Sequence, residues 1–83
     1  SVERSLIVFE VAESLLAPLM EDVELGFPGV HSFSLPSVGD GADGKPPRRH
    51  VELGVRGSDE SIVEHAFSKL RAGVLALGAE VSP

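Results

Sequence analysis

Residues 49–78, RHVELGVRGSDESIVEHAFSKLRAGVLALG, decide the fold because they contain a strand, a turn and a helix in succession. Residues 49–56 alternate between apolar and polar side chains, which is typical of a half-buried strand. Residues 57–59, Gly-Ser-Asp, predict a turn that caps the following helix. From Glu60 to Leu77 apolar residues recur at helical spacing, and Gly78 marks the exit. The predicted apolar stripe consists of Ile62, Val63, Ala66, Phe67, Leu70, Val74 and Leu77.

A second strand and helix precede this stretch. Residues 4–12 mix β-branched and aromatic residues and predict a first strand covered on both faces. Residues 13–25 have the spacing of an amphipathic helix, in which Ser14 is the expected cap and Pro18 requires a late start. Gly26, followed by Phe-Pro-Gly, predicts a left-handed exit. The apolar stripe of this helix is expected to be Leu15, Leu16, Leu19, Met20, Val23 and Phe27.

Two alternating segments flank a run that is rich in glycine and proline. In residues 30–35, His31, Phe33 and Leu35 share one face and two serines the other, which is typical of a strand with one face in water. Residues 37–48, SVGDGADGKPPR, can hold neither helix nor strand, and we expect a mobile loop. The strands on either side pair most simply as a long-looped antiparallel hairpin.

The predicted order is strand, helix, strand, strand, helix, with a possible short last strand at residues 79–81. A right-handed crossover places the first two strands parallel, and the hairpin adds an antiparallel neighbour. Both helices must cover the same face of the sheet to share one core. We therefore expect residues 1–83 to form a single α+β domain. Its fold should be a two-layer β-α-β-β-α sandwich, KH-like or split ferredoxin-like, with a mixed three-stranded sheet.

The composition excludes several classes of function. The 83 residues include no cysteine, which rules out a disulfide framework, a thiolate metal site and a cysteine nucleophile. The net charge of −6 disfavours general nucleic-acid binding, because such a surface repels phosphates. No apolar run approaches the roughly 20 residues that span a bilayer, so we expect a soluble, cytoplasmic domain. The start at Ser1 suggests that it is excised from a longer protein.

The glycine motifs lack the context that their chemistry needs. Gly39, Gly41 and Gly44 have the G-x-G-x-x-G spacing of a phosphate-binding loop, but residues 45–47, Lys-Pro-Pro, prevent the helix that must follow. The G-x-x-G spacings at residues 26–29 and 41–44 correspond to the loop with which KH domains grip nucleic acid. Both lack basic residues, so we interpret the first as a helix exit and the second as part of the loop.

The polar residues predict no catalytic, cofactor-binding or metal-binding site, and no cofactor is expected. His31, His50 and His65 lack ligand spacing and are expected at or near the surface. The basic residues Lys45, Arg48, Arg49 and Arg56 are expected to be solvated charges. An alternative is that Arg48, Arg49 and Arg56 contact an anion beside the hairpin. The acidic residues interpreted as caps and solvated charges are Glu13, Asp40, Asp43, Glu52 and Glu60.

A family resemblance rests on a succession of short phrases that covers nearly the whole chain. These are Arg4-Ser5-Leu6, Ala12-Glu13-Ser14-Leu15-Leu16, Phe27-Pro28-Gly29-Val30, Ser34-Leu35-Pro36-Ser37, Val51-Glu52-Leu53-Gly54-Val55-Arg56-Gly57 and a closing helix with Ala66 and Leu70. Together they resemble the small C-terminal KH-like domain that follows the molybdopterin-binding domain in the competence- and damage-inducible protein A (CinA) family.

The resemblance implies a parent protein whose active cleft, of molybdopterin-binding or nucleotide pyrophosphatase type, lies in the preceding domain. This chain is then a non-catalytic accessory domain that packs against that cofactor- or nucleotide-binding domain or against a partner subunit, including a second copy. The alternatives are a small regulatory module that binds an anion and, on weaker grounds, a KH-like module that binds RNA.

Overall fold

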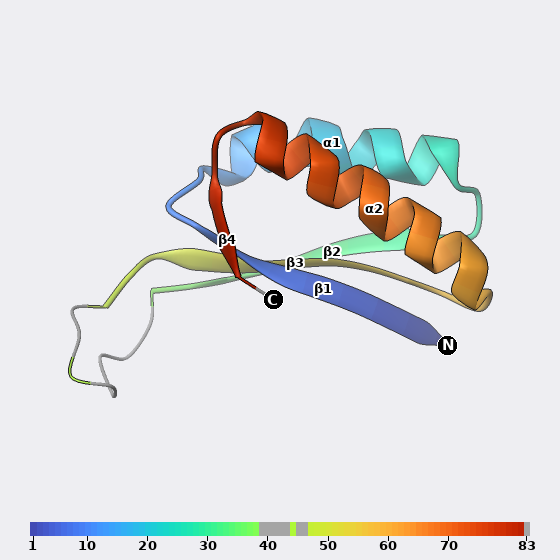
Figure 1. Ribbon diagram of the computed structural model, residues 1–83, viewed down its shortest axis with the longest axis horizontal. Helices are drawn as coiled ribbons and strands as arrows, with labels where there is room; N and C mark the ends of the chain where they lie inside the picture. The colour runs from blue at the N-terminus through green and yellow to red at the C-terminus, as the bar shows by residue number, and fades with distance from the viewer. Residues whose placement is uncertain (39–43, 45–46, 83) are drawn as a thin grey trace.

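The computed structural model describes residues 1–38, 44 and 47–82. Its elements are β1 (Val2–Phe9), α1 (Glu13–Gly26), β2 (His31–Ser37), β3 (His50–Gly57), α2 (Glu60–Ala76) and β4 (Glu80–Ser82). Both helices lie side by side on one face of the sheet (Figure 1). The predicted two-layer α+β sandwich is therefore confirmed.

The sheet differs from the prediction in two respects. It has four strands in the order β2-β3-β1-β4, and all neighbours are antiparallel. The expected mixed, three-stranded sheet is wrong, because β3 inserts between β1 and β2 and a fourth strand pairs with β1. That fourth strand, β4, confirms the possible short last strand expected at residues 79–81. The result is the β-α-β-β-α-β order of ferredoxin-like folds.

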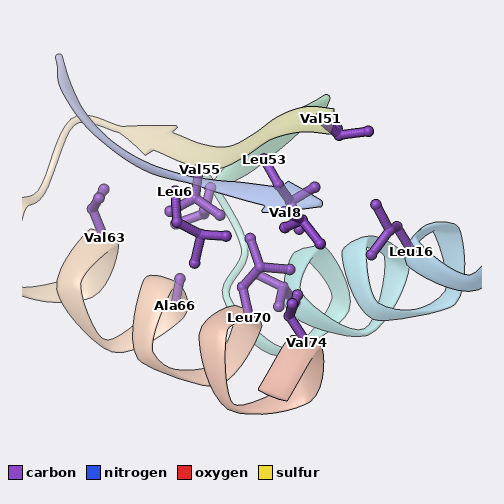
Figure 2. Packing of buried hydrophobic residues seen from close by; sticks show 12 residues of the cluster. Leu6, Val8, Leu16, Val51, Leu53, Val55, Val63, Ala66, Leu70 and Val74 are labelled. Carbon is purple, nitrogen blue, oxygen red and sulfur yellow. The ribbon is translucent and has the colours of Figure 1, made fainter. Parts of the chain in front are cut away.

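The core fills the space between the helices and one face of the sheet. Figure 2 shows side chains from β1 and β3 pointing towards the helices, and side chains from α2 pointing back towards the strands. The expectation that β1 is covered on both faces is wrong, since both helices lie on the same side. The buried core residues are Leu6, Val8, Leu16, Val23, Val30, Val51, Leu53, Val55, Val63, Ala66, Leu70 and Val74.

Helix α1 begins without the expected cap. Ala12 occupies the N-cap position and makes no side-chain cap hydrogen bond, so Ser14 lies inside the first turn. Pro18 lies within the helix rather than before it, and its missing N–H leaves the carbonyl of Ser14 without the usual i→i−4 bond.

The exits of the two helices differ. The left-handed residue after α1 is Gly29, with φ 91°, and not the predicted Gly26. Helix α2 follows the prediction, because the carboxylate of Asp59 accepts a hydrogen bond from the Ile62 N–H at 3.0 Å. Gly78 follows with φ 80°, as expected. The outer members of the predicted stripes are exposed, namely Leu15 at 54%, Ile62 at 41% and Leu77 at 44%.

The predicted alternation of β2 is confirmed, and its serine side faces the helices. The carboxylate of Glu24 accepts hydrogen bonds from the backbone N–H and the hydroxyl of Ser32, at 2.7 and 2.8 Å. These bonds lower the pKa of Glu24. The hydroxyl of Ser34 donates to Glu13 at 3.2 Å. Phe33 and Leu35 consequently lie on the side of the sheet that the helices leave uncovered.

Candidate functional surface

The sheet face opposite the helices is the surface on which side chains from several strands gather. Strand register places alternate residues there, because their neighbours Leu6, Val8, Leu53 and Val55 point into the core. We call this surface the open face. Its members are Glu3, Ser5, Ile7 and Phe9 on β1; His31, Phe33, Leu35 and Ser37 on β2; His50, Glu52, Gly54 and Arg56 on β3; and Glu80 and Ser82 on β4.

An aromatic ring lies across the middle of the open face because its neighbour has no side chain. Phe33 is opposite Gly54 in the β2–β3 register. A Cβ atom added at Gly54 would lie 2.5 Å from the Phe33 Cζ and 2.5 Å from the carbonyl oxygen of Arg4. Glycine therefore leaves the space that the edge of the ring occupies. The guanidinium carbon of Arg56 lies 5.1 Å from the ring centroid, within cation–π range.

The neighbouring row combines apolar side chains with one anchored carboxylate. Leu35, Glu52 and Ile7 lie side by side across β2, β3 and β1. Glu52 accepts a hydrogen bond from the Ser5 hydroxyl at 2.8 Å. Leu35 is 57% exposed, whereas Ile7 and Phe33 are half-buried. The centre of the open face is thus an apolar patch with one fixed charge.

A charged cluster closes one end of the open face. The guanidinium of Arg48 donates to both carboxylate oxygens of Glu80, at 2.9 and 3.1 Å, and to Glu10 at 3.1 Å. Its carbon also lies 4.3 Å from the centroid of Phe9. The bonds from Arg48 lower the pKa of Glu80, and those from Glu80 and Glu10 raise the pKa of Arg48. The cluster ties the segment before β3 to β1 and β4.

The three arginines of the predicted anion contact do not come together. Arg48 and Arg49 precede β3, and Arg56 lies near its other end, roughly 23 Å from Arg49 at the rise of an extended strand. Arg48 already binds two carboxylates. Arg49 lines a separate cavity of about 240 Å³ that also includes Glu13. An anion contact made by all three arginines stays a prediction.

The histidines are equally dispersed. His31 and His50 lie at opposite ends of the open face, and His65 is exposed on α2. No group of three or more histidine, aspartate and glutamate side chains in residues 1–38, 44 and 47–82 could hold a metal ion. Of the residues with the G-x-G-x-x-G spacing, Gly39 and Gly41 lie outside the described residues, as do Asp40, Asp43 and Lys45.

The interior of the described structure offers no reactive group. None of its buried residues is polar or charged, and no buried side-chain polar atom there is without a hydrogen-bond partner. The alternation of residues 31–37, together with that of residues 50–56, was the signal in the sequence for the open face, which was not predicted as a surface. That signal did not say which side of each strand the helices would cover.

Comparison with known proteins adds no assignment to these observations. No family model matches the chain, no curated protein matches it and no solved structure matches it. Within the part of the chain that the structure describes, no helix is both long and apolar enough to cross a membrane.

Proposed function

We propose that this chain is a non-catalytic accessory domain of a CinA-like or molybdopterin-binding-like cytoplasmic protein, and that it packs against a cofactor- or nucleotide-binding domain or a partner subunit. The open face carries the proposal. It presents Ile7, Phe33 and Leu35 on adjacent strands and is covered by neither helix. An apolar centre with charged residues at its rim is typical of a protein–protein contact.

The arrangement of polar groups on the open face also favours packing over chemistry. Arg48 and Glu80 hold each other, and Ser5 holds Glu52. Such internally satisfied pairs need no external ligand to neutralise them. A domain that contributes a preformed surface, while the active cleft lies elsewhere, is what the family resemblance implies.

Calorimetry on the isolated domain tests the non-catalytic part of the proposal. Titration with a molybdopterin analogue and with ADP-ribose is expected to give no measurable heat of binding. ADP-ribose incubated with the domain should also remain unhydrolysed. Tight binding of either compound, or turnover, would contradict the accessory role.

A regulatory anion-binding module is the second candidate. The observation in its favour is the cavity of about 240 Å³ at the uncapped start of α1, where Arg49 lies with Val11, Ala12 and Pro36. Titration with inorganic phosphate, followed by the backbone amide signals of Arg48, Arg49 and Arg56, separates the two proposals. Signals that do not move rule out this module.

A further inference from the structure

The two outer edges of the sheet differ in the backbone groups that they offer. The Ser32 N–H donates to Glu24 and therefore points away from β3. In an antiparallel ladder, residues alternate between pairs that exchange hydrogen bonds and pairs that do not. Ser34 and Pro36 therefore also direct their backbone groups towards the outer edge of β2.

The β2 edge is closed to a further strand. Its Ser32 N–H is occupied by Glu24, and Pro36 has no N–H. Of these three residues only Ser34 retains an outward N–H that the described contacts do not engage. A proline and a capped donor are devices by which edge strands avoid pairing.

The β1 edge is open over part of its length. Val55 lies opposite Ser32 on one side and opposite Arg4 on the other. Because Val55 does not exchange hydrogen bonds with Ser32, its backbone groups point to β1 and pair with Arg4. The hydrogen bond from the Glu10 N–H to the Arg49 carbonyl agrees with this alternation. Glu3 and Ser5 therefore point their backbone groups away from β3. The Glu3 carbonyl accepts a hydrogen bond from the Arg4 guanidinium at 2.9 Å, whereas the described contacts engage neither the Glu3 N–H nor the backbone groups of Ser5 on this side. Within the described residues β4 pairs only with residues 7–9, so it does not reach Glu3 or Ser5. Figure 1 shows β1 continuing well past β4.

A cavity opens beside this free edge, between the strands and α2. Its volume is about 190 Å³, and its lining includes Ser5, Leu6, Phe67 and Arg71. Phe67 supplies an apolar wall, and Arg71 supplies a charge for which the described structure has no ion pair. Arg4, by contrast, is already bound to Glu60 and Glu64.

We propose that the β1 edge at Glu3 and Ser5 accepts an extended segment of a partner protein as an additional strand. The outward N–H of Glu3 and the outward N–H and C=O of Ser5 are matched by another extended backbone. The segment places an apolar side chain in the cavity beside Phe67 and an acidic side chain on Arg71. The side chains of Glu3 and Ser5 belong to the open face, but this proposal uses their backbone groups at the edge of the sheet, so it does not depend on the proposed function.

A second copy of the chain fits the same edge less well than an acidic segment does. Two β1 strands paired through Glu3 and Ser5 would bring Arg4 of each copy directly opposite the other. Their Cα atoms would be only about 4.5 Å apart, the spacing of a pair that does not exchange hydrogen bonds. Like charges in this position are destabilising. Charge thus favours an acidic segment of a different protein.

Selection from a displayed library of short random peptides tests the proposal. The immobilised 83-residue chain is expected to enrich peptides in which polar and apolar residues alternate and an acidic residue accompanies the apolar ones. A synthetic peptide of the most enriched sequence is then the probe. Its binding should slow amide hydrogen exchange at Glu3 and Ser5 and leave exchange at Ser34 unchanged.

Variants at the two edges supply the matched control. Glu3→Pro removes one outward N–H and no bond to β3, and we expect it to weaken the Kd of the probe about tenfold. Glu3→Gln, which keeps that N–H, and Ser34→Pro, at the other edge, should bind as the unaltered chain does.

Arg71→Ala should weaken binding about fivefold. Enrichment of no peptide, or equal binding to Glu3→Pro and Glu3→Gln, would overturn the proposal, as would self-association through β1.

Discussion

Gly54 leaves the space that the Phe33 ring occupies at the centre of the open face. An alanine there would place its Cβ 2.5 Å from the Arg4 carbonyl oxygen, a backbone atom that cannot rotate away. We expect Gly54→Ala to lower the free energy of unfolding by about 2 kcal/mol, in the range of overpacked sites. Urea denaturation measures this change.

Gly73 provides the control for that substitution. A Cβ at Gly73 would meet the Leu19 Cδ2 at 2.9 Å, and this atom is the end of a flexible side chain. Gly73→Ala also gains helix propensity, by up to about 1 kcal/mol. The gain in helix propensity and the cost of displacing the Leu19 side chain should roughly cancel, so the free energy of unfolding should change little. A loss at Gly73 as large as that at Gly54 would contradict the distinction between a backbone and a side-chain contact.

The carboxylates of Glu24 and Glu80 make stability depend on pH. Both have a pKa below the ordinary value of 4.5 in the folded state, because Ser32 and Arg48 respectively donate to them. A lowered folded-state pKa means that their contribution is present above about pH 4.5 and is lost as the pH falls through the lowered value.

The pH dependence can be assigned by substitution. Thermal unfolding of the Glu80→Gln variant should lose less stability between pH 6 and pH 3 than the unaltered chain. Glu21→Gln, on α1, serves as the control and should retain the full dependence. Identical pH profiles for Glu80→Gln and the unaltered chain would show that the bonds from Arg48 do not contribute.

At the scale of the element, the start of α1 lacks a capping side chain, and a substitution that supplies one should stabilise the fold. Ala12 has φ −67° and ψ 138°, the extended geometry of an N-cap, but no side chain that can accept a hydrogen bond. We expect Ala12→Ser to raise the free energy of unfolding by about 1 kcal/mol. Ser14→Ala removes no capping hydrogen bond and should leave the free energy of unfolding nearly unchanged. Destabilisation by about 1 kcal/mol in Ser14→Ala would restore Ser14 as the cap and contradict the observed helix start.

The elements also show where sequence reasoning ends. The apolar spacing of residues 60–77 and the cap at Asp59 predicted α2 closely, because both signals are local. The alternation of β2 was equally clear. It did not predict that Ser32 and Ser34 would face the helices, since that depends on Glu24 and Glu13 of α1 reaching across to them.

At the scale of the whole molecule, the two-layer arrangement followed from the need of two amphipathic helices for one shared core. The strand order did not follow, because β1 pairs with β3 across more than forty residues of sequence. Because β1 and β2 follow each other along the chain, a parallel β1–β2 pair was expected. In the structure β1 pairs with the more distant β3 instead. The open face and the open β1 edge are consequences of that order, so neither could be read from local patterns.

Methyl NMR with a soluble paramagnetic agent tests most directly whether the open face is a packing surface. Ile7 and Leu35 lie at its centre, and Leu25 on α1, which is 81% exposed, is the reference. In the isolated, dilute domain the Leu35 methyls should relax as strongly as those of Leu25. In the proposed parent protein, or in a solution concentrated enough for the domain to dimerise, Ile7 and Leu35 should become protected while Leu25 does not. Unchanged relaxation of Ile7 and Leu35 in both assemblies would contradict the account.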